Sequence, residues 1–236
     1  MKLLNRLFGR RPSEQRSTTE AEATRPPSGA SQSRGASQTT AWSADLLFTA
    51  TEPSCNDRVR WVAEVAGFDD VAFGARAASS ARHLGAARIE ELAGLFHAEH
   101  TPPADLTSRF PGLGAWMSAR QFAIFEIFFH IGAPALPALR RVAFGQYDWT
   151  QGNAIEVLCR LAADGVERTA IVEELKVHLP DIRDEAIQYA LAPLLYQQTS
   201  NAALREVLSK LRAVPIFSDW YQEIEMARSG GQSTEN

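Results

Sequence analysis

Apolar residues recur every three or four positions across residues 42–226, and no stretch alternates strictly between apolar and polar side chains. That spacing places apolar side chains on one face of an α-helix, whereas a half-buried strand requires alternation. Breaks rich in Pro, Gly, Asp and Asn divide the region into about nine or ten short segments joined by short connections. We therefore predict an all-α domain over residues 42–226 with antiparallel neighbouring helices, whose glycines cap the helix ends.

The flanking segments have a different composition. Residues 12–40 contain no Val, Ile, Leu, Met, Cys, Phe, Tyr or Trp. Such a segment cannot offset its loss of conformational entropy by burying apolar surface. We expect a disordered linker over residues 12–41 and a disordered tail over residues 227–236.

The net charge of −4 averages two unlike parts of the chain. Residues 1–41 carry seven Lys/Arg and three Glu, a net +4, and residues 42–236 carry 17 Lys/Arg and 25 Asp/Glu, a net −8. An acidic helical domain excludes a uniformly basic nucleic-acid binder. No P-loop, dinucleotide fingerprint or nucleophile elbow occurs in the sequence, and we expect neither a nucleic-acid partner nor a cofactor.

A short pattern repeats along the domain. The Ala-Ile pairs at residues 123–124, 154–155 and 186–187 are 31 and 32 residues apart. Small residues at such a period let stacked helix pairs approach closely, although an irregular all-α domain rich in Ala could show the same spacing by chance. Extending the period backwards reaches Ala93 and Ala63.

These helices resemble a known family. The segments 59–67, 120–132 and 182–186 resemble the second helix of HEAT-like repeats of the short type also seen in phycobilisome lyases, and 135–141 is similar to that family's first helix. The resemblance is clearest over residues 118–197, and Tyr189 departs from it because a small residue is usual there. It implies a right-handed stack of antiparallel helix pairs, an α-solenoid, whose second helices line a concave surface.

Two pairs of residues are candidates for chemistry. His97 and His100, at i and i+3, would point the same way on a helix and are weak candidates for zinc ligands, the alternative being a basic helix end that answers the helix dipole. Glu126 and His130 are spaced i, i+4 on the most apolar helix. A buried carboxylate beside an imidazole is a weak catalytic candidate, because the sequence fixes no nucleophile near it.

Residues 1–11 form a short basic amphipathic segment. Its apolar residues make one helical stripe, and its basic residues lie elsewhere: Leu3, Leu4, Leu7 and Phe8, against Lys2, Arg6, Arg10 and Arg11. Such a segment can lie on an anionic membrane or dock on a partner protein. With two cysteines and no long apolar span, the chain is expected to be cytoplasmic, at most peripheral to the inner face of a membrane.

These features favour a non-enzymatic adaptor that binds another protein, preferably a basic one, through its curved surface. Polar residues of the second helices that fall off the Ala-Ile stripe are the expected contacts: Gln121, Asn153, Glu156, Arg160, Asp184, Glu185 and Gln188. Two alternatives share these features. One is a stoichiometric inhibitor or immunity-type protein, and the other is a lyase- or hydrolase-type enzyme on a HEAT-like scaffold.

Overall fold

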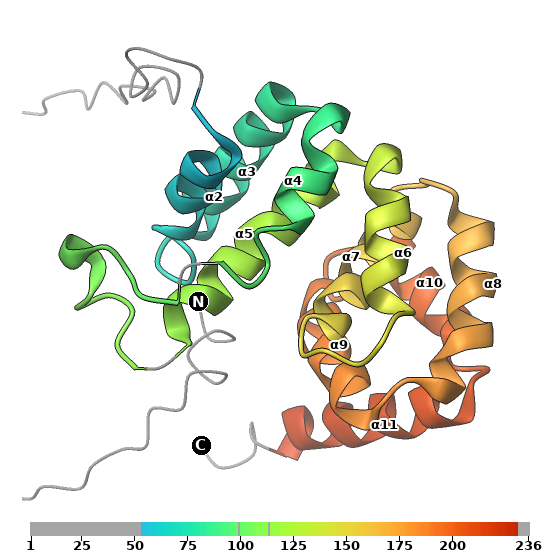
Figure 1. Cartoon of the computed structure of the whole chain (residues 1–236). Helices are drawn as coiled ribbons and strands as arrows, with labels where there is room; N and C mark the ends of the chain where they lie inside the picture. Colours follow the sequence, from blue (N-terminus) through green and yellow to red (C-terminus); the bar gives the residue numbers. More distant parts are fainter. Residues whose placement is uncertain (1–52, 99, 113, 231–236) are drawn as a thin grey trace, which may run out of the picture.

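A computed structural model describes residues 53–98, 100–112 and 114–230. This part of the chain is all-helical, as predicted, and contains no strand (Figure 1). Its ten α-helices are α2 (Cys55–Ala63), α3 (Asp70–Leu84), α4 (Ile89–Ala93), α5 (Ala115–Ile131), α6 (Leu136–Ala143), α7 (Gln151–Ala163), α8 (Arg168–His178), α9 (Asp184–Gln197), α10 (Ala202–Leu211) and α11 (Pro215–Gly230).

Local sequence signals explain where several helices begin and end. Ser54 and Asp57 form a capping box at the start of α2, and the side chain of Asn201 accepts a hydrogen bond from the Leu204 amide at the start of α10. Gly132 ends α5 with a φ of 78°, a conformation that costs glycine little. These caps satisfy backbone groups that the helix itself leaves without partners.

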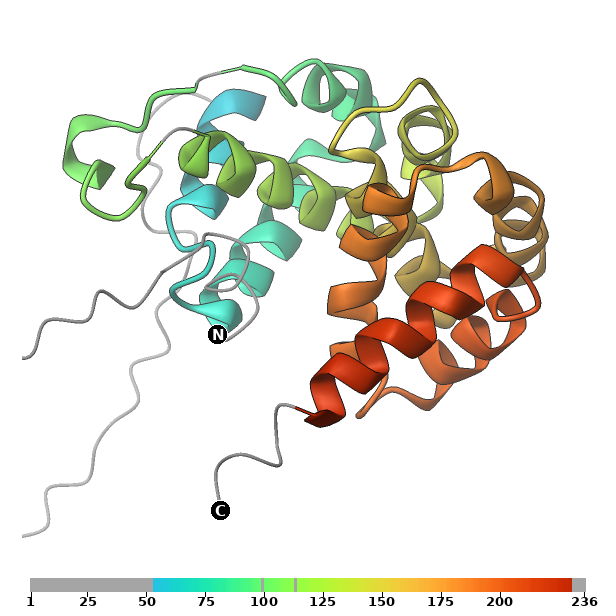
Figure 2. The same ribbon diagram turned by 90° about the horizontal axis from the view of Figure 1, so that it is seen from below.

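The helices that carry the Ala-Ile pairs lie beside one another in chain order. Helix α7 packs against both α5 and α9, and α11 packs across α9 (Figure 2). Helices α2 and α3 pack on α5, whereas α6, α8 and α10 pack on α7. Helix α7 therefore occupies the centre of the packing.

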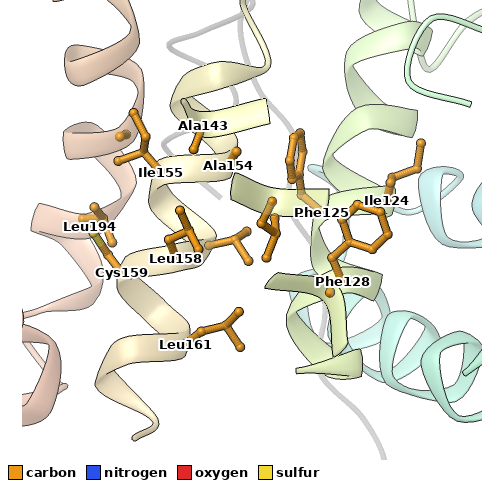
Figure 3. Close-up of a cluster of buried hydrophobic side chains, with 14 of the residues drawn as sticks. Ile124, Phe125, Phe128, Ala143, Ala154, Ile155, Leu158, Cys159, Leu161 and Leu194 are labelled. Atoms are coloured by element: carbon orange, nitrogen blue, oxygen red, sulfur yellow. The ribbon is translucent and has the colours of Figure 1, made fainter. Parts of the chain in front are cut away.

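The core follows this central row of helices. All six residues of the three Ala-Ile pairs are buried, and Phe125 and Phe128 of α5 face Leu158 and Leu161 of α7 (Figure 3). Burying one such large apolar side chain stabilises a fold by about 1.5–3 kcal/mol. Between α7 and α9 the two backbones come so close that a Cβ atom added to Gly152 would lie 2.6 Å from the Ala186 carbonyl oxygen. Gly152 thus serves a close helix contact, and the prediction that the glycines cap helix ends does not account for this position.

Several sequence predictions fall outside the described residues or at their edge. The basic segment 1–11, the linker 12–41 and residues 231–236 of the tail lie outside them. Helix α11 continues to Gly230, four residues beyond the predicted end of the helical domain. Among the described residues, no helix combines the length and the apolar character needed to cross a membrane. Cys55 and Cys159 are both buried and free.

Candidate functional site

A cavity of about 440 Å³ opens between α5, α7 and α9, with the connection from α2 to α3 at its edge. We call it the central groove. Its apolar wall includes Phe73 of α3, Phe122 and Phe125 of α5, Trp149 before α7, and Tyr189 of α9. Trp149 is 54 % exposed and Tyr189 47 % exposed, which is unusual for such large aromatic side chains. The volume is within the range of cavities that bind ligands.

Polar side chains from three helices meet in this groove. Arg160 of α7 donates two hydrogen bonds to the Glu126 carboxylate of α5, at 2.7 and 2.9 Å. Its guanidinium also lies 3.9 Å from the centre of the Phe129 ring. Glu156, one turn before Arg160, accepts a hydrogen bond of 3.0 Å from the Gln197 amide of α9. The cluster thus joins the three helices α5, α7 and α9 through charged and amide groups.

The two carboxyl groups of the cluster have opposite pKa shifts. Burial raises the pKa of Glu126, but hydrogen bonds from His130 and Arg160, with the charge of Arg160, outweigh it and bring this pKa to about 2. Burial raises the pKa of Glu156, and the charge of Arg160 offsets only part of that effect. Glu126 is therefore the ionised partner of Arg160, while Glu156 is a carboxyl group with little stabilisation of its charge.

Four of the seven predicted contact residues line the central groove: Gln121, Asn153, Glu156 and Arg160. Gln121 is almost fully buried, and its amide donates a hydrogen bond to the Phe96 carbonyl, so its role is structural. Asp184, Glu185 and Gln188 lie on α9 but do not line the groove. The groove thus brings together four of the predicted contact residues and leaves out the three on α9.

Glu126 and His130, the candidate catalytic pair, lie close together as predicted, but Glu126 also pairs with Arg160. His130 Nε2 lies 3.5 Å from Glu126 Oε1, as expected for residues at i and i+4 on α5. The same carboxylate is bound on both oxygens by Arg160. A carboxyl group with a pKa near 2 is a poor general base at neutral pH.

The prediction that His97 and His100 point the same way from one helix is wrong, because neither residue lies in a helix. Helix α4 ends at Ala93, followed by Gly94, so His97 and His100 lie in the connection to α5. His97 Nε2 is 3.0 Å from Asp148 Oδ2 instead. Among the described residues, no group of three or more His, Cys, Asp and Glu side chains is arranged to hold a metal ion.

Sequence reasoning missed Trp149 and Tyr189, the exposed aromatic residues of the groove. Both had a signal: Trp149 stands in a polar turn, and Tyr189 occupies a position where the resemblance to HEAT-like repeats leads us to expect a small residue. Comparisons with protein-family models, with curated proteins and with solved structures gave no match.

Proposed function

We propose that this protein is a non-enzymatic adaptor that binds a segment of another protein in the central groove. One observation carries the proposal: two half-exposed aromatic side chains line a groove that charged side chains also line. Trp and Tyr are the side chains that most often contribute large binding energies at protein interfaces. Polar groups among apolar walls give orientation and specificity to a bound segment.

The packing of the helices supports a HEAT-like arrangement as part of this proposal. Helices α5, α7 and α9 would be the second helices of successive units and line the concave side, with α6 and α8 as first helices. Most of the residues that line the groove belong to α5, α7 and α9. The basic segment 1–11 would act as a second contact point, on an anionic membrane surface or on the partner.

The enzyme alternative has less support, because Arg160 holds the candidate catalytic carboxylate ionised. An inhibitor of the immunity type would use the same groove and differ in forming one tight stoichiometric complex. Measuring the stoichiometry of the isolated complex distinguishes adaptor from inhibitor.

Site-specific photo-crosslinking in the source cells tests the proposal. A photoreactive phenylalanine placed at Tyr189 of the full chain is expected to give a discrete crosslinked protein. The matched control position is Val177, which is exposed on α8 and lies outside the groove. The proposal fails if position 189 gives no crosslinked protein, or if both positions give the same ones.

A further inference from the structure

Glu156 is a mostly buried carboxyl group with little cationic compensation. Its side chain is 13 % exposed, and it lies 3.6 Å from Arg160. The shorter hydrogen bonds of Arg160, at 2.7 and 2.9 Å, go to Glu126. The remaining close partner of Glu156 is the neutral amide of Gln197. A buried carboxylate in this situation costs free energy unless a cation comes near it.

The charges of the cluster are also unbalanced. When ionised, Glu126 and Glu156 carry two negative charges against the single positive charge of Arg160. His130 lies on the Glu126 side of the cluster and adds a positive charge only when protonated. With both carboxyl groups ionised, the cluster has one negative charge more than Arg160 neutralises, and Glu156 lines the groove.

The other residues that line the groove suit a cationic side chain with an apolar stem. The groove is lined by the half-exposed aromatic side chains of Trp149 and Tyr189 and by the aliphatic ring of Pro193. Arginine and lysine pack their stems on such surfaces while the charged end meets an acceptor, and aromatic faces attract cations.

We propose that the central groove binds an arginine or lysine side chain, flanked by apolar side chains, on the partner protein, and that Glu156 accepts its hydrogen bond. This inference rests on the proposed function and names the chemistry of the bound segment. Glu126 would remain paired with Arg160 and keep the cluster rigid.

Panning random 12-residue peptides against the full chain tests this inference. Wild type is expected to select peptides with Arg or Lys between apolar residues, and Glu156→Gln is expected to bind them about tenfold more weakly. Glu185→Gln, a glutamate of α9 outside the groove, is the matched control and should bind as wild type does. Glu156→Gln should melt no lower than wild type, because it removes a poorly compensated buried carboxylate.

A change in the peptide leaves the folding of the protein unaffected. Replacing the selected arginine by citrulline, which keeps the shape and removes the charge, is expected to weaken binding to wild type to the same extent. If citrulline binds equally well, or if peptides that depend on Trp149 lack any cationic residue, the inference is wrong and the proposed function stands. If no peptide binds, or binding is indifferent to Trp149→Ala and Tyr189→Ala, the proposed function fails as well.

Discussion

Replacing Arg160 by methionine is expected to destabilise the fold by about 3–5 kcal/mol, seen as a lower midpoint of urea denaturation. The substitution keeps much of the side-chain volume but removes the guanidinium from Glu126 and Glu156, and leaves His130 as the remaining basic neighbour of Glu126. It also removes the guanidinium from the face of Phe129. A loss below about 1 kcal/mol would contradict this description of the cluster.

The effect of this substitution should depend on pH. In wild type the pKa of Glu126 is lowered to about 2, so its favourable contribution is present above the unfolded pKa near 4 and disappears as pH falls towards 2. Without Arg160, burial is expected to raise this pKa above the unfolded value, with only His130 to oppose it. The difference in stability between variant and wild type should therefore shrink as pH is lowered from 7 to 5.

Arg141→Met is the matched control. Arg141 binds Glu90 at 2.7 Å, but both side chains are more than half exposed, and such pairs contribute about 0–1 kcal/mol. The control separates the loss of any Arg–Glu pair from the loss of a cation beside two buried carboxyl groups. Equal destabilisation by the two substitutions would show that burial in the groove is not the cause.

Gly152→Ala is expected to destabilise the protein by about 1–3 kcal/mol, because the new methyl group has no room between α7 and α9. Its Cβ would lie 2.7 Å from the Tyr189 Cβ and 3.3 Å from the Ala190 nitrogen, as well as against the Ala186 carbonyl. Helix α9 must then move away from α7, which also displaces Tyr189 at the groove. Thermal denaturation followed by circular dichroism measures the change.

The same substitution at Gly74 should have the opposite sign. Gly74 lies inside α3, and a Cβ there meets nothing within 4 Å. Gly74→Ala is expected to stabilise the protein by about 0.5–1 kcal/mol, because alanine loses less backbone entropy in a helix. A stabilising Gly152→Ala would mean that the two helices are not in close contact.

The sequence predicts the helices well because their signal is local. The Ala-Ile pairs mark α5, α7 and α9, and all six residues are buried in the core. The contact at Gly152 could not be predicted, since it depends on the crossing of α7 and α9 and not on either helix alone. The histidine prediction failed because a helix was extended past Gly94, beyond the end of α4.

The candidate site was predictable only in part. The sequence predicted three residues of the groove, Asn153, Glu156 and Arg160. They are polar residues next to the buried Ala-Ile stripe, so helical periodicity places them at the border of the buried face. The pairing of Arg160 with Glu126, 34 residues earlier, depends on how neighbouring helices pack. Trp149 reaches the groove from a turn, where no periodic pattern gives a side chain its direction.

A binding measurement shows whether the central groove is the surface that binds another protein. The partner protein identified by photo-crosslinking is titrated against the full chain, and its dissociation constant is measured for wild type and for the double variant Trp149→Ala, Tyr189→Ala. Both side chains are half exposed, so their removal should leave the fold intact. We predict binding at least about thirtyfold weaker, as expected for the loss of roughly 2 kcal/mol at an aromatic anchor. Val177→Ala, which lies outside the groove, is the matched control and should bind as wild type does. An unchanged dissociation constant for the double variant would show that the groove is not the binding surface.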